Sequence, residues 1–118
     1  MMRKRLSLLF PLCLAFGSST FAAQSHSAVP ELPRLTLNSF APKIHQQIDE
    51  AYSFARSHAE DAEASGRLGM VLQTHGLLQE AADCYRRAMQ LEPNSFQWTY
   101  YLGAIEALCA AHTRTRVF

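Results

Sequence analysis

The sequence has few of the residues from which catalytic and metal centres are usually assembled. It holds three cysteines and five histidines in 118 residues, with no Cys-x-x-Cys pair and no His-Glu-x-x-His motif. It also lacks a glycine-rich phosphate loop and a Gly-x-Ser-x-Gly elbow. These absences exclude the common signatures of zinc, nucleotide and serine-hydrolase chemistry. We therefore expect a non-catalytic protein without a metal or a cofactor.

A large excess of one charge is absent as well. The chain has 11 basic and 10 acidic residues, a net charge of +1. Arg3, Lys4 and Arg5 lie in a segment that we expect to be removed, and 11 less these three leaves 8 basic residues against 10 acidic ones. A mildly acidic domain lacks the basic footprint of a nucleic-acid-binding protein. We therefore expect no nucleic-acid partner.

The N-terminus has the pattern of an export signal. The basic start MMRKR is followed by the apolar run LSLLFPLCLAFG and by the small residues of SSTFAA. The run is too short to cross a bilayer comfortably, and Pro11 interrupts it. We predict a signal peptide over residues 1–22, cleaved after Ala22, and a mature protein in the bacterial periplasm or outside the cell without a stable membrane span. A buried N-terminal helix is the alternative.

The next segment, residues 23–41, reads as an extended linker. Pro30 and Pro33 interrupt it, and it shows no sustained period. We expect some of its apolar residues to dock on the helices as a strap: Leu32, Leu35, Leu37 and Phe40.

A helix is predicted from about Pro42, with Ser39 as a possible cap, because apolar residues then recur at steps of three and four. It fades near residues 57–60. The apolar stripe consists of Ile44, Ile48, Ala51, Tyr52 and Ala55.

Residues 62–95 contain two apolar-periodic halves with a glycine turn between them. Asp61 can cap the first helix, which is predicted to end near Gln73 or Thr74. His75-Gly76 makes the turn, and a second helix runs from about Leu78 to Leu91 before Pro93 stops it. We expect Gly69 to face Ala81 where the two helices approach closely.

After Pro93 the pattern restarts and then breaks off. Leu102-Gly103 lies 34 residues beyond Leu68-Gly69, and FQWTYYLGAIEALCAA reads as another first helix. The segment that follows predicts no second helix. We expect a helical domain over residues 42–111 and a tail over 112–118, and a truncated or frameshifted gene product is one explanation for this ending.

The residues Leu68-Gly69, Ala81, Tyr85, Ala88 and Pro93 carry a resemblance to the tetratricopeptide repeat (TPR), a helix–turn–helix unit of about 34 residues. Tyr52 and Ala55 precede Tyr85 and Ala88 by 33 residues. The resemblance implies an all-α fold, a short α-solenoid piece of about four helices with one full repeat at 62–95 and a half repeat on either side. The chain departs from the family at Ser65, where a Trp is usual, and at Leu72. An ordinary helical hairpin is the alternative.

In TPR proteins the first helices of successive repeats line a concave surface that holds a peptide or a helix of a partner. Carried over by position, the resemblance implies a protein-binding groove at Glu63, Gly66, Met70, Gln73, Thr74, Gln97, Tyr100, Ala104, Ala107 and Leu108. The basic residues and asparagines that clamp a carboxylate in some members are absent at these positions, so that ligand is not expected.

Three functions are compatible with these patterns. The first is an adaptor that binds a protein or peptide in the cell envelope. The second is a helical remnant that associates with itself through the Trp98–Leu108 face, and the third is a fragment of a larger TPR-containing enzyme.

Two further expectations concern side chains on the helices. Glu80, Asp83, Arg86 and Arg87 read as a solvated helix face with local ion pairs. Cys84 and Cys109 read as two packed or partly buried thiols, with a strained disulfide as the alternative.

Overall fold

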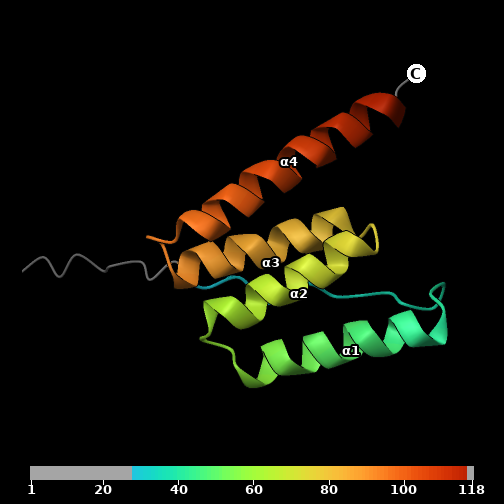
Figure 1. Ribbon diagram of the computed structural model, residues 1–118, viewed down its shortest axis with the longest axis horizontal. Coiled ribbons are helices and arrows are strands. Elements are labelled where there is room, and N and C mark those ends of the chain that lie inside the picture. The colour runs from blue at the N-terminus through green and yellow to red at the C-terminus, as the bar shows by residue number, and fades with distance from the viewer. Residues whose placement is uncertain (1–27, 117–118) are drawn as a thin grey trace, which may run out of the picture.

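The computed structural model describes residues 28–116, in which four helices follow an extended segment (Figure 1). The helices are α1 (Pro42–Ser57), α2 (Ala62–Thr74), α3 (Leu78–Leu91) and α4 (Phe96–Arg116). Among the described residues there is no β-strand. The prediction of an all-α piece of stacked helices is therefore confirmed. The predicted signal peptide lies outside the described residues.

Each helix packs on the one that follows it in sequence. Figure 1 shows α1, α2 and α3 side by side, with α4 inclined away from them toward its C-terminal end. None of the four helices is long and apolar enough to cross a membrane.

The boundaries of α2 and α3 follow from local signals in the sequence. The Asp61 side chain accepts a hydrogen bond of 3.0 Å from the backbone N–H of Glu63 and so caps α2. At the other end, Gly76 has a φ of 78°, which a residue with a side chain rarely adopts. The Leu77 N–H then donates to the Leu72 carbonyl at 2.9 Å, which closes a Schellman turn between the helices.

Helix α1 begins at Pro42 as predicted, but one predicted cap and one predicted helix end are wrong. The residue that precedes α1 is Ala41, and no side chain caps this helix, so the predicted Ser39 cap is absent. Helix α4 does not stop near residue 111 but continues to Arg116. Ala110 and Ala111 have high helix propensity, no glycine or proline follows them, and arginines suit the negative end of a helix dipole.

The core lies between the helices and is built around large side chains with little or no exposure. The fully buried ones include Ile48 on α1, Leu68 and Leu72 on α2, Tyr85 on α3, and Trp98 and Ile105 on α4. Helices α2 and α3 therefore share one core with α1 and α4.

The close approach of α2 to α3 occurs at Gly69, but its neighbour is not the one expected. A Cβ atom on Gly69 would lie 2.8 Å from the Tyr85 ring and 3.2 Å from the Cβ of Cys84. The nearest neighbours of Gly69 are thus Tyr85 and Cys84 and not the expected Ala81, which lies one turn before Tyr85 on α3. Glycine fits here because the Tyr85 ring lies too close to the α2 backbone for a side chain.

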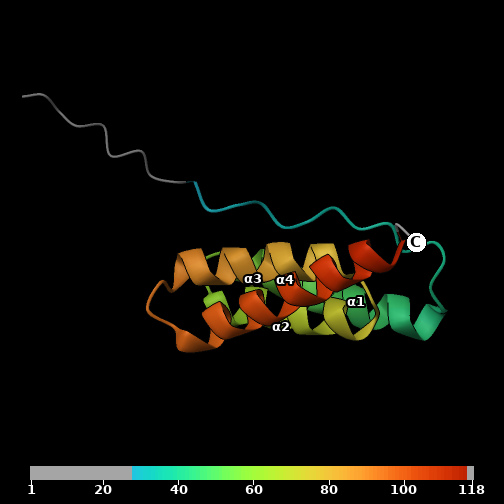
Figure 2. The ribbon, with the colours of Figure 1, turned by 90° about the horizontal axis from the view of Figure 1, so that it is seen from above.

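The expected strap is present. Leu37 is buried with 8% exposure, and three other apolar residues of the segment pack against the core: Leu32, Leu35 and Phe40. We call residues 28–41 the strap. In Figure 1 it crosses between α1 and α3 behind α2, and Figure 2 shows it along the side of the helices away from α2.

The expectation of a solvated face on α3 is correct for Arg86 and wrong for Arg87. Arg86 forms ion pairs with Asp83 at 2.8 Å and with Glu106 of α4 at 3.1 Å. Arg87 is only 9% exposed, and its guanidinium donates to the Ser65 hydroxyl at 3.2 Å. Arg87 is thus buried against Ser65 of α2 and not solvated with Arg86.

Candidate functional site on α2 and α4

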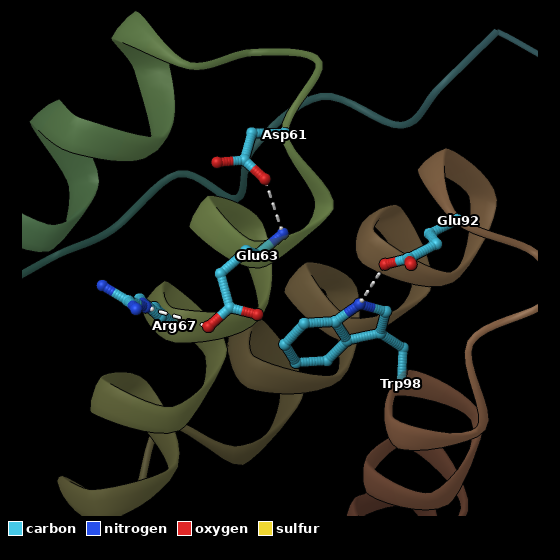
Figure 3. Close-up of polar contacts among 5 residues, drawn as sticks. All are labelled: Asp61, Glu63, Arg67, Glu92 and Trp98. Atoms are coloured by element: carbon cyan, nitrogen blue, oxygen red, sulfur yellow. Dashed lines mark hydrogen bonds and ion pairs between the residues drawn. The ribbon is translucent and has the colours of Figure 1, made fainter.

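The predicted groove residues lie on α2 and α4, which approach each other at their N-terminal ends. Trp98 makes this contact. Its ring covers Gly66 so closely that a Cβ atom there would collide with it. Its indole Nε1–H donates to the carboxylate of Glu92 at 3.2 Å. Figure 3 shows the indole reaching from α4 toward α2 with its nitrogen turned toward Glu92.

The assignment of Gly66 to an open groove is therefore wrong. This residue is buried under the Trp98 ring and has no surface to offer a ligand. Close packing, and not access for a peptide backbone, accounts for glycine at this position.

The other predicted residues on α2 keep some accessible surface, but much of their polar capacity is used within the helix layer. Glu63 is exposed and pairs with Arg67 Nε at 3.0 Å (Figure 3). Gln73 is half-buried and accepts a hydrogen bond of 2.8 Å from the Tyr85 hydroxyl. Thr74 donates to the carbonyl of Met70 at 2.8 Å. The α2 half of the predicted groove is therefore relatively polar, and its side chains already form hydrogen bonds within the protein.

The predicted residues on α4 form the more exposed half. Tyr100 is 62% exposed and Leu108 is 47% exposed. Gln97, Ala104 and Ala107 are also exposed. Because α4 is inclined away from the other helices (Figure 1), its C-terminal half lies apart from the predicted residues at the end of α2. The structure thus joins the two halves near Trp98 and separates them toward Leu108.

A neighbouring aromatic residue belongs with this surface although it is absent from the prediction. Phe96 is 82% exposed, and its ring stacks on Tyr100 with 6.2 Å between centroids. The sequence places Phe96 in the first turn of a predicted helix. Apolar periodicity alone does not distinguish an exposed aromatic residue from a buried one, so the prediction of the groove did not include it.

The two exposed rings rest on a row of more buried aromatic residues. Tyr100 meets Tyr101 edge to face at 5.9 Å, and Tyr101 stacks on the buried Tyr85 at 5.4 Å. Trp98 lies 6.2 Å from Tyr101. The row places large aromatic side chains side by side at the surface, and aromatic residues are enriched among those that anchor protein contacts.

A groove of about 460 Å³ lies where α4 diverges from the start of α3. Leu77 and Leu78 supply its apolar wall, Glu80 faces it from α3, and Cys109 and His112 from α4. Cys109 is half-buried and Cys84 is buried, and both are free thiols, so the interpretation as two packed thiols is confirmed. Burial raises the pKa of Cys84 to about 12, with a smaller contribution from Asp83. This thiol is therefore unsuited to nucleophilic chemistry near neutral pH.

Within residues 28–116 no group of three or more histidine, cysteine, aspartate or glutamate side chains is placed to hold a metal ion. No protein-family model, curated protein or solved structure matches this chain. The candidate site rests on its own geometry.

Proposed function

We propose that this protein is an exported, non-catalytic interaction module of the TPR type, which binds a segment of another protein with the exposed face of α4 and the adjoining part of α2. The observation that carries the proposal is the row of aromatic residues that ends in Phe96 and Tyr100 at the surface. Exposed aromatic side chains release water when a partner covers them, which favours binding.

The repeat pattern supports the same proposal. Gly69 of α2 is covered by Tyr85 of α3, whereas Gly103, which is 34 residues further on, has nothing within 4 Å of a Cβ atom. Helix α3 packs on α2 at Gly69, whereas no described residue packs on α4 at Gly103. A helical or extended segment of a partner fits such a face through close contact with Gly103, Ala104 and Ala107.

Site-specific photocrosslinking tests this function. A benzoylphenylalanine at position 100 is expected to yield one discrete adduct with an envelope protein, because Tyr100 lies at the centre of the proposed contact. The same group at position 46, where Gln46 is exposed on α1, is the matched control. Equal and diffuse labelling from both positions would contradict the proposal.

Self-association is the second candidate, and the open face of α4 favours it as well. A second copy would cover Phe96 and Tyr100 without any other partner. Light scattering over a range of concentrations separates the two candidates. Self-association predicts that the measured mass rises from that of a monomer to that of a dimer as the concentration is raised, and that Tyr100→Asp stays a monomer throughout.

A further inference from the structure

The strap, residues 28–41, runs along the side of the helices away from α2 (Figure 2). We call the apolar helix surface on which it packs the groove. Leu37 is 8% exposed, and Leu32, Leu35 and Phe40 pack against the core. The strap is an extended segment attached to the helices at one end, through Ala41. It therefore lies on the helices as a bound peptide would.

One side chain supplies the polar contact between the strap and the helices. Within residues 28–116, the hydrogen bond that joins strap residues 28–40 to the helices runs from Arg87 Nη1 to the carbonyl oxygen of Pro30. The Phe40 N–H donates to Leu37, which is itself in the strap, at 3.0 Å. The strap is thus held by apolar contacts and by Arg87.

The bonding of Arg87 is unusual for a buried charge. Besides Pro30 it donates to the Ser65 hydroxyl at 3.2 Å and to the Ala59 carbonyl at 2.5 Å. All three acceptors are neutral, and Arg87 takes part in none of the ion pairs found among the described residues. A buried guanidinium is normally paired with a carboxylate, because removal from water is costly and a carboxylate compensates better than a carbonyl does.

The strap is also incompletely packed. A cleft of about 580 Å³ lies between strap residues 34–38 and α1, where His45, Asp49 and Tyr52 form the other wall. Glu31 offers the strap a carboxylate next to Pro30, but its side chain is exposed and makes no hydrogen bond to Arg87. An open cleft and an unpaired buried charge both make the strap a weaker occupant of the groove than a complementary segment would be.

We propose that the groove beneath the strap is a second binding site, distinct from the α2–α4 surface, for an extended apolar segment of another protein that carries a carboxylate. The strap occupies this site when the partner is absent. The incoming segment displaces the strap, its apolar side chains replace Leu35 and Leu37, and its carboxylate pairs with Arg87 in place of the Pro30 carbonyl.

Two synthetic peptides that differ by one carboxylate test this proposal. Both contain residues 31–41 of this sequence and a C-terminal fluorophore. One has an N-terminal succinyl group and the other a butyryl group of the same chain length. The acyl carbonyl of each stands at the position of the Pro30 carbonyl, and only the succinyl group adds a carboxylate there.

Fluorescence anisotropy with the full chain is expected to show saturable binding, with the succinyl peptide about tenfold tighter than the butyryl peptide. The difference shrinks as salt is raised. Leu37→Ser in the strap is expected to tighten binding of the succinyl peptide, because a strap that buries less apolar surface is displaced more readily. Unchanged affinity in this variant would show that the strap does not compete for the groove.

Adjacent arginines provide the matched control. Arg87→Leu abolishes the preference for the succinyl peptide, whereas Arg86→Leu, which changes only surface ion pairs, retains it. Arg87→Lys keeps the positive charge but lacks the planar guanidinium that can donate two parallel hydrogen bonds to a carboxylate, so it reduces the preference. Circular dichroism verifies that each variant is folded.

Two results on the unmodified chain would overturn the proposal without any variant. Absence of saturable binding by either peptide would do so. Equal affinity for the two peptides would also refute it and would indicate that the groove accepts a neutral segment, such as the strap of a second copy.

Discussion

At the scale of the residue, three glycines that all lie in helices have different physical roles. Gly66 lies under the Trp98 ring, Gly69 lies against Tyr85, and Gly103 faces open space. All three are in helices, where glycine costs about 1 kcal/mol relative to alanine. Glycine is therefore required by packing at the first two positions and is merely tolerated at the third in the free chain.

Alanine substitutions separate these roles. Gly66→Ala is expected to destabilise the fold by about 1–3 kcal/mol, because the new Cβ atom forces Trp98 out of its position. Gly103→Ala is expected to stabilise the free chain by about 0.5–1 kcal/mol, since helix propensity rises and nothing is displaced. Urea denaturation of the two variants measures both changes, and equal effects would show that Trp98 does not pack on Gly66.

The two cysteines of the described residues differ in reactivity for a reason that also acts at this scale. Cys84 is fully buried, and burial raises its pKa to about 12, while Cys109 is half-buried at the edge of α4. Iodoacetamide at pH 8 is expected to modify Cys109 and to leave Cys84 intact in the folded chain. Mass mapping of tryptic peptides measures the two sites separately, and denaturation with urea before labelling is the control in which both react.

At the scale of the element, the helices begin and end where their local signals place them, except where tertiary contacts take over. Asp61 caps α2, and Gly76 ends it through a left-handed turn. Helix α1 has no side-chain cap, and instead it begins with Pro42 and depends on packing of Ile48 and Ala55.

Loss of the α2 cap should affect overall stability, because α2 packs on both α1 and α3. Asp61→Ala is expected to cost about 1 kcal/mol of unfolding free energy, because the Glu63 N–H loses its acceptor. Asp61→Asn retains an acceptor and should cost much less. Thermal unfolding followed by circular dichroism measures both, and equal losses would assign the effect of Asp61 to its charge.

At the scale of the whole molecule, a single core links the strap and all four helices. Two ionisable groups lie inside it. Burial raises the pKa of Cys84 from 9.0 to about 12, and burial together with Tyr101 raises that of Tyr85 from 10.0 to about 12. In both cases the folded state holds the proton more tightly than the unfolded state.

This linkage predicts a specific dependence of stability on pH. The contribution of both groups is fully present below pH 9, where each is protonated in both states. It is lost as the pH rises from about 9 to about 12, because the unfolded chain then releases protons that the folded chain keeps. Urea midpoints from pH 7 to 11 measure the loss, which should be smaller in Tyr85→Phe than in the unmodified chain.

Much of the fold followed from the sequence because its signals are local. The spacing of apolar residues, the Asp61 cap, the Gly76 turn and Pro93 each act over a few residues, and they predicted the bounds of α2 and α3 closely. The strap was also predictable, since leucines at short intervals in an extended segment need an apolar surface. The groove was predicted only in part, because a pattern carried over from a family does not reveal which position Trp98 covers.

What only the tertiary structure decided depends on contacts between residues far apart in the chain. Arg87 looks like a surface residue beside Arg86, yet it is buried because Ser65, Ala59 and Pro30 converge on it from three segments. Gly66 is buried and Phe96 is exposed because α4 meets α2 at its first turns and then diverges. Apolar periodicity determined the helices by itself, but the angle at which α4 leaves the others arises from side-chain packing across the whole core, which no local pattern encodes.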